Sequence, residues 1–114
     1  LMKKSKNPCV ISSMCTIFAE SEIISLLSQK VPVEDIAAGT GRSIARRILA
    51  MGRSAQISYT EPIVFSGGVA NNEAIADIFA DLLGKPVTAI KMPQSTAALG
   101  AALRARKMWA SEQK

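Results

Sequence analysis

A glycine pair is the first segment of this 114-residue chain whose residue types could do chemistry. Gly67-Gly68 directly follows an apolar, β-branched run and precedes Asn71-Asn72. Glycines at the carboxyl end of a strand let a ligand touch the backbone, and free N–H groups at the start of a helix bind polar or anionic atoms. The segment has neither the Gly-Lys-Ser/Thr ending of a P-loop nor the spacing of a dinucleotide fingerprint, so a plain strand-to-helix turn is the alternative interpretation.

Two cysteines are the second candidate for chemistry. Cys9 and Cys15 lie six residues apart, and the chain has no histidine. A self-contained zinc site needs four close-spaced ligands, so this pattern excludes one. On composition alone, a small buried hydrophobe is the ordinary role of a lone cysteine.

Helical periodicity dominates the first half of the chain that must position these residues. One helix is expected over about 18–28 and a second over about 34–52, separated by a break at Pro32. Gly39 and Gly41 lie in the second helix, where they either weaken it or allow another element to approach closely. Its expected apolar face consists of Ile36, Thr40, Ile44, Ile48 and Met51.

The second half alternates strands and helices. Residues 62–66 and 86–90 are short apolar runs typical of buried strands. The helix between them is expected to start at Asn71 or Asn72 and to stop at Gly84. A last helix is expected from a Ser95 cap to about residue 108, with small residues over 97–103 packed on the sheet. The order is helix-helix-strand-helix-strand-helix, and the two strands should pair in parallel.

Composition limits the chain to one domain or less. It is 48% apolar and 20% charged, and no apolar run approaches the roughly 20 residues of a membrane span. Two strands are too few for a stable parallel sheet, so residues 1–114 are expected to be a single partial α/β domain. Residues 1–10 are then a cut linker or a strand remnant. A soluble, cytoplasmic protein with no membrane partner is the default expectation.

The basic charge does not indicate a nucleic-acid partner. Fourteen Lys and Arg against nine Asp and Glu give a net charge of +5. The bases are scattered and lack the interleaved aromatic side chains that stack nucleic-acid bases. A solvated helix face, or a contact with acidic protein, explains them better.

Four segments together resemble one family. They cover residues 12–23 around Cys15, residues 35–45, residues 66–72 with the glycine pair, and residues 98–102. Their order and spacing closely resemble the activators of 2-hydroxyacyl-CoA dehydratases and the related ATPase subunits of benzoyl-CoA reductase. The cysteine segment is the specific one, because the glycine segment alone indicates only the wider actin, Hsp70 and sugar-kinase (hexokinase-like, ribonuclease H-like) superfamily of ATPase domains.

The resemblance implies the carboxyl-terminal part of such an ATPase domain. It implies ATP with Mg²⁺, and a homodimer that shares one [4Fe-4S] cluster across its interface. It also implies a low-potential electron passed to an acyl-CoA dehydratase or aryl-CoA reductase. Cys15 matches a cluster ligand, and the adenosine-contacting turn matches Ser66, Gly67, Gly68, Val69, Ala70, Asn71 and Asn72.

The departures from the family pattern keep alternatives open. The second ligand cysteine and the acidic phosphate and magnesium motifs have no counterpart here, so no catalytic residue is assigned and the chain alone should not hydrolyse ATP. Residues 36–42 resemble the missing cysteine segment, with Ile36 in the place of the cysteine, but they belong to the following helix. Cys9 has no counterpart and is interpreted as an ordinary thiol. The alternatives are a small-molecule (sugar) kinase of the same superfamily, which would not need Cys15, and a non-enzymatic basic binding module.

Overall fold

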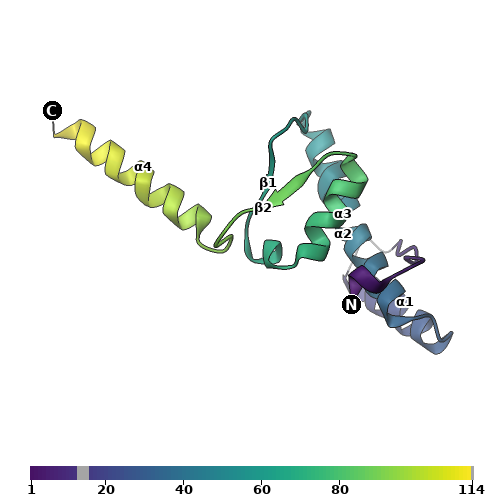
Figure 1. The fold of residues 1–114 in the computed structure, drawn as a ribbon. Coiled ribbons are helices and arrows are strands. Elements are labelled where there is room, and N and C mark those ends of the chain that lie inside the picture. The colour runs from purple at the N-terminus through teal and green to yellow at the C-terminus, as the bar shows by residue number, and fades with distance from the viewer. Residues whose placement is uncertain (13–15, 114) are drawn as a thin grey trace.

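The computed structural model describes residues 1–12 and 16–113, with the side chains of residues 16–18 outside the description. Figure 1 shows the arrangement of its elements. In chain order these are η1 (Met2–Lys4), α1 (Thr16–Ser28), α2 (Val33–Ser54), β1 (Ile63–Phe65), η2 (Gly68–Asn71), α3 (Glu73–Leu83), β2 (Val87–Ala89) and α4 (Thr96–Glu112), where η marks a 3-10 helix. The expected order of helices and strands is confirmed, and the two 3-10 helices are additions to it.

A β-α-β unit forms the middle of the molecule. β1 and β2 pair in parallel with Ile63 opposite Val87, and α3 connects them. The ring of Phe65 lies 5.2 Å from that of Phe79 on α3, at an interplanar angle of 57°. The other face of β1 carries Val64, which is 55% exposed. The sheet is therefore covered by α3 on one side, and within the described residues nothing buries its other side.

The hydrophobic core lies between α2 and α3. Its buried residues are Ala45, Leu49, Ile75, Ile78 and Phe79. Burial of the four larger side chains among these contributes about 1.5–3 kcal/mol each to folding. The contact between α2 and α3 is therefore the main source of tertiary stability.

The buried face of α2 differs from the expected one. Ile44, Ile48 and Met51 are between 48% and 66% exposed, whereas the buried positions of α2 include Ala38, Gly41 and Ala45. Small residues let α3 and the N-terminal segment approach the helix axis, and Leu49 fills the core beside them, whereas the side chains of Ile44, Ile48 and Met51 are exposed. The prediction of an apolar face through Ile44 and Ile48 was therefore wrong for the contacts within this chain.

Gly39 and Gly41 of α2 are sites of close approach. This confirms the interpretation that these glycines allow another element to approach the helix. A Cβ at Gly39 would collide with the backbone carbonyl of Cys9, and one at Gly41 would lie 2.9 Å from Cδ1 of Ile78. The carbonyl of Cys9 belongs to the backbone, so it cannot move aside as the flexible end of the Ile78 side chain can. Gly39 therefore allows the N-terminal segment to lie against α2.

The ends of α3 follow the prediction. Asn72 is the N-cap, and its side-chain oxygen accepts a hydrogen bond of 3.2 Å from the backbone N–H of Ala74. Gly84 ends the helix in the left-handed conformation at φ 63°, and its N–H donates to the carbonyl of Ala80. A glycine adopts this φ without the steric cost that a side chain would add.

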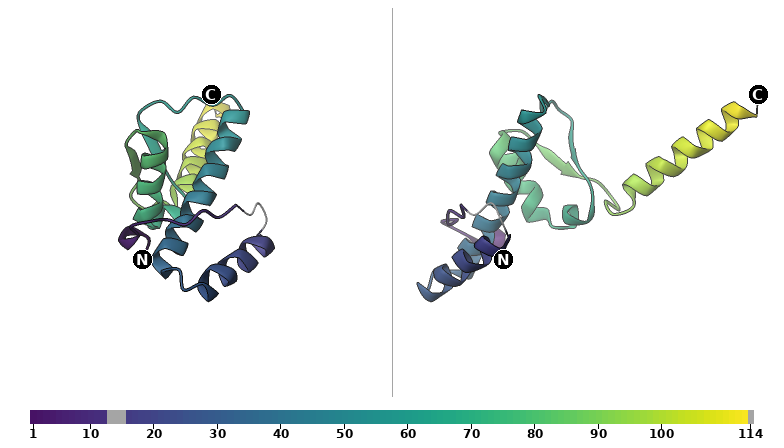
Figure 2. Two further views of the ribbon diagram at one scale, coloured as in Figure 1. Left: turned by 90° about the vertical axis from the view of Figure 1, so that its right-hand side faces the viewer. Right: turned by 180° about the vertical axis from the view of Figure 1, so that it is seen from behind.

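α4 projects away from the rest of the molecule, as the views in Figures 1 and 2 agree. None of its 17 residues is buried. The expected packing of residues 97–103 on the sheet is therefore wrong for this chain, and the Ser95 side chain makes no capping hydrogen bond. The molecule measures 67 × 28 × 27 Å with a radius of gyration of 18.1 Å, against about 13 Å for a compact chain of this length.

The N-terminal segment is neither an extended linker nor a strand. It contains η1 (Met2–Lys4) and runs along α2, where the N–H of Cys9 donates to the carbonyl of Asp35 at 3.1 Å. Within the described part of the chain, no helix is both long enough and apolar enough to cross a membrane.

Candidate nucleotide-binding turn

The turn after β1 is held by its own backbone. The N–H of Gly67 donates to the carbonyl of Pro93 at 2.9 Å, and the N–H of Ala70 donates back to the carbonyl of Gly67 at 3.0 Å. Gly67 has φ 97°, a conformation that residues with a side chain rarely adopt. Ala70 is only 3% exposed and anchors η2 in the interior. These backbone hydrogen bonds therefore fix the conformation of the turn between β1 and α3.

The outer side of this turn is open. A Cβ built on Gly67 or on Gly68 would meet no heavy atom within 4 Å. Val69 is 61% exposed, and Ser66, Asn71 and Asn72 are exposed as well. The absence of side chains leaves room for a ligand to touch the backbone, which is the arrangement that phosphate and nucleotide sites use.

The two asparagines serve the turn itself. The side-chain amide of Asn71 donates to the carbonyl of Gly68 at 3.1 Å, and that of Asn72 caps α3. Ser66, Gly67, Gly68, Val69, Ala70, Asn71 and Asn72 thus form one continuous turn, as the sequence predicted. The glycine backbone is the part left free for a ligand, and the asparagines hold its shape.

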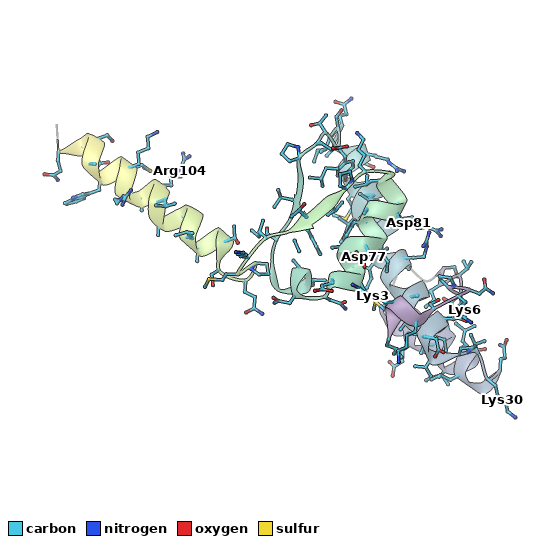
Figure 3. The ribbon with its side chains drawn as sticks, in the orientation of Figure 1. Lys3, Lys6, Lys30, Asp77, Asp81 and Arg104 are labelled. Carbon is cyan, nitrogen blue, oxygen red and sulfur yellow. The ribbon has the colours of Figure 1, made fainter. Side chains whose placement is uncertain are left out.

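A residue that the sequence did not point to lies beside this turn. Nζ of Lys3 is 2.9 Å from Oε2 of Glu73 and 3.2 Å from Oδ2 of Asp77, near the start of α3 (Figure 3). The hydrogen bonds to Glu73 and then to Asp77 raise the pKa of Lys3 above its ordinary value. Lys3 and Glu73 are 70 residues apart in the chain, so no local spacing signals the pair.

Asp35 holds the next part of the N-terminal segment. This carboxylate is 9% exposed and accepts hydrogen bonds from Oγ of Ser5 at 2.6 Å and from the N–H of Asn7 at 3.2 Å. The hydrogen bond from Ser5 is the main reason that the pKa of Asp35 lies below its usual value. A buried carboxylate is tolerated because it is hydrogen-bonded. Asp35 and Lys3 together hold η1 close to the turn.

Between this segment, α2 and α3 lies a cavity of about 400 Å³. Its rim carries two ion pairs, Lys3 with Asp77 and Arg42 with Asp81, whose Nη2 and Oδ2 atoms are 2.7 Å apart. Figure 3 labels Lys3, Asp77 and Asp81 along this side of the molecule. Among the described residues that line this cavity, the charged side chains are therefore paired with one another.

The proposed cluster ligand, Cys15, lies outside the described residues. Ser12 just before it is tied to α1, since its N–H and Oγ both donate to the carboxylate of Glu22 at 3.2–3.3 Å. Cys9 is a half-buried free thiol. Within residues 1–12 and 16–113, no three His, Cys, Asp or Glu side chains gather closely enough to hold a metal ion.

A strand, an open glycine turn and a capped helix in parallel β-α-β order define the α/β class of protein, whose ligands commonly lie at the carboxyl ends of the strands. Comparison with known proteins identifies the family. The sequence model of the BadF/BadG/BcrA/BcrD ATPase family matches residues 1–105, so the chain belongs to that family.

Individual relatives agree with this assignment. The chain is 43% identical over 101 residues to the 2-hydroxyisocaproyl-CoA dehydratase activator of Clostridioides difficile, covering 89% of this chain and 37% of the relative. It is 40% identical over 104 residues to the (R)-2-hydroxyglutaryl-CoA dehydratase activating ATPase of Acidaminococcus fermentans, covering 91% and 39%. The chain thus spans about two fifths of the length of these relatives.

A solved structure supports the fold. The activator of the 2-hydroxyisocaproyl-CoA dehydratase from Clostridium difficile, solved with bound ADPNP, superimposes with a TM-score of 0.86 at 38% identity. The match covers 98% of this chain and 41% of that one. The fold is therefore that of part of an actin-like ATPase domain, as the sequence predicted.

Proposed function

We propose that this chain is the carboxyl-terminal portion of an ATP-dependent activator, and that its Ser66–Asn72 turn contacts the adenosine part of ATP. One observation carries the proposal: the glycine backbone at the end of β1 is open on the side where a ligand would approach. Membership of an ATPase family supports the choice of ligand, and so does the ADPNP in the similar activator.

Titration of the protein with ADPNP, followed by amide NMR, tests this turn. A Gly68→Val variant places a branched side chain on the open face, so we expect its Kd for ADPNP to rise about tenfold or more. Gly100→Val on the exposed α4 is the matched control and should leave the Kd unchanged. Equal affinities of the two variants, or shifts confined to residues away from 66–72, would contradict the site.

We further propose that the intact protein transfers an electron to a partner enzyme. A homodimer would hold one [4Fe-4S] cluster, with Cys15 as one of the two ligands from each subunit, because thiolates are the usual ligands of such clusters. When bound, the cluster supplies a low-potential electron, and the partner would be a 2-hydroxyacyl-CoA dehydratase or an enzyme of the benzoyl-CoA reductase type. The relatives named as activators of dehydratases support this partner class.

Iron and acid-labile sulfide analysis of the intact gene product, purified without oxygen, tests the cluster. About four irons per dimer are expected in the parent and in Cys9→Ala, and loss of iron in Cys15→Ala. Cys9→Ala is the control for general damage, since the half-buried Cys9 thiol is assigned no ligand role. A parent without iron would favour a small-molecule kinase of the same superfamily, which has no use for Cys15.

The chain on its own is expected to lack ATP turnover. No catalytic residue is assigned within it, and Mg²⁺ and the phosphates would be held by segments that the relatives have and this chain does not match. Steady phosphate release above that of the Gly68→Val variant would overturn this part of the proposal.

A further inference from the structure

A groove lies between the carboxyl-terminal parts of α2 and α3. It holds a cavity of about 340 Å³, which is lined by Arg46, Leu49 and Arg53 of α2 and by Leu82 of α3. Leu49 is 3% exposed and belongs to the core, and Leu82 packs against that core. The floor of this α2–α3 groove is therefore apolar, with one arginine on each side of Leu49 along α2.

The two arginines of the groove carry charge that the fold does not use. Both are exposed, and among the described residues neither guanidinium group has a carboxylate within 4 Å. Asp81, the acidic neighbour of Leu82 on α3, is already engaged by Arg42 at 2.7 Å. Arg46 and Arg53 therefore give the groove two positive charges that no described carboxylate neutralises.

The spacing of these arginines fits one face of a second helix. Arg46 and Arg53 are seven residues apart, which is two turns and about 10 Å along α2. A helix lying along the groove presents two carboxylates at the same distance when they too are seven residues apart. Side chains three or four residues after the first carboxylate lie on the same face, where they can reach Leu49 and Leu82.

The chemistry of the groove favours a protein segment over a small anion. Arginine is enriched in protein interfaces, because its guanidinium group is weakly hydrated and binds a carboxylate through two parallel hydrogen bonds. A small inorganic anion would neutralise charge and leave the apolar floor in water. An acidic amphipathic helix satisfies both the charges and the floor, and a groove between helices is a recurring binding mode for such a segment.

The groove is distinct from the regions proposed to contact ATP and to hold the cluster. Its lining shares no residue with the glycine turn. α1, which follows Cys15 in the chain, lies beside the opposite end of α2 (Figures 1 and 2). A segment bound in the groove would therefore contact the protein at a further place.

We propose that the α2–α3 groove docks an acidic amphipathic helix of a partner protein. Two carboxylates of that helix pair with Arg46 and Arg53, and an apolar side chain between them covers Leu49 and Leu82. The contact surface is small, so the Kd for the isolated helix is expected to be on the order of 10–100 μM. Docking requires neither nucleotide nor cluster.

A designed peptide is the probe for this groove. It is an acetylated helix of about 18 residues on an alanine and glutamine background, with two glutamates seven residues apart and two leucines between them. On its addition to the parent, amide NMR shifts should appear in residues 46–53 and at Leu82. Glutamine in place of both glutamates should raise the Kd about tenfold, and glutamine in place of both leucines about three- to tenfold.

Paired arginine substitutions test the protein side. Arg46→Gln combined with Arg53→Gln should raise the Kd of the acidic peptide about tenfold, because two ion pairs are lost. Arg104→Gln combined with Arg106→Gln makes the same charge change on the exposed α4 and should leave the Kd unchanged. All four arginines are exposed, so both double variants should unfold at the urea concentration of the parent. Raising the salt from about 50 to about 500 mM should weaken binding of the acidic peptide.

Each contrary outcome overturns the proposal. Equal affinities of the two double variants would mean that net charge, rather than the groove, holds the peptide. Equal binding of the peptide without leucines, together with its full displacement by inorganic tripolyphosphate, would mean that the groove is a small-anion site. A parent that does not bind the acidic peptide has no docking groove. ADPNP should bind both double variants with the Kd of the parent, so failure of the groove leaves the proposed function standing.

Discussion

The two long helices α2 and α4 differ more in their surroundings than in their length. α2 has 22 residues, three of them glycines, and eight of its residues are buried. α4 has 17 residues, six of them alanine, and none is buried. Glycine in a helix interior costs about 1 kcal/mol relative to alanine, so α2 relies on its packing and α4 on its intrinsic propensity.

This difference shows that a helical pattern does not indicate where a helix packs. In α2 the glycines lie where the chain needs close contact, whereas among the described residues a Cβ at Gly100 of α4 would meet no heavy atom within 4 Å and no residue of α4 is buried. Substitutions in the two helices, and a pH series on the N-terminal segment that packs against α2, test this difference.

The largest effect is expected for paired aromatic truncations. Phe79→Ala removes a 6% exposed core side chain and should lower the free energy of unfolding by about 3–5 kcal/mol. Trp109→Ala on α4 removes a 65% exposed side chain and should change it by less than about 0.5 kcal/mol. Urea unfolding followed by circular dichroism measures both. A loss of more than 1.5 kcal/mol (roughly half the core effect) for Trp109→Ala would show that α4 is packed.

Paired glycine substitutions come next. Gly39→Ala places a Cβ against the carbonyl of Cys9 and should destabilise by about 1–3 kcal/mol. Gly100→Ala has no neighbour within 4 Å and should stabilise α4 by about 0.5–1 kcal/mol. Thermal unfolding by circular dichroism compares them. Effects of the same sign would remove the contrast between the two helices.

Acid should release the N-terminal segment from the body. The pKa of Asp35 is below its ordinary value in the folded state, so its contribution to stability is complete above that ordinary value and is lost as the pH falls through the folded-state pKa. Asp35→Asn should therefore be less stable than the parent near neutral pH, with the difference shrinking on acidification. Amide signals of Asn7 should move in the same pH range, and those of α4 should not.

A difference between parent and Asp35→Asn that stays constant from about pH 6 to about pH 2.5 would contradict this assignment, because a titrating carboxylate must change its contribution across that range. Asparagine keeps one acceptor oxygen for Ser5, so the variant tests the charge rather than the whole contact.

The smallest effect is expected at the Arg42–Asp81 ion pair. Its side chains are 31% and 59% exposed, and exposed pairs contribute about 0.2–1 kcal/mol. Arg42→Ala should cost that much more than Arg46→Ala, which removes an exposed arginine of the same helix. Salt should reduce the difference, because it screens exposed charges. A larger, salt-independent cost would mean that Arg42 acts through packing.

Local signals in the sequence predicted most of the fold. Asn72 and Gly84 marked the ends of α3, and the apolar runs over 62–66 and 86–90 marked two strands that pair in parallel. Gly67-Gly68 marked the open turn. Each of these features depends on residues close together in the chain, which is why periodicity and turn chemistry find them.

The features that were missed are the long-range ones. The Lys3–Glu73 pair joins residues 70 positions apart, and the Asp35–Ser5 contact joins residues 30 apart. The buried face of α2 also depends on its partner: Ala45 is buried because α3 lies against its side of the helix, and the neighbouring Ile44 is exposed.

The isolation of α4 has a consequence for proteolysis. Trypsin cuts after arginine and lysine, and Arg104, Arg106 and Lys107 lie on this exposed helix. A helix with no buried residue opens at little cost, whereas Arg46 and Arg53 lie on α2, whose opening would break the core. Limited digestion should therefore trim the molecule from α4 first and leave the α2–α3 body with its glycine turn intact.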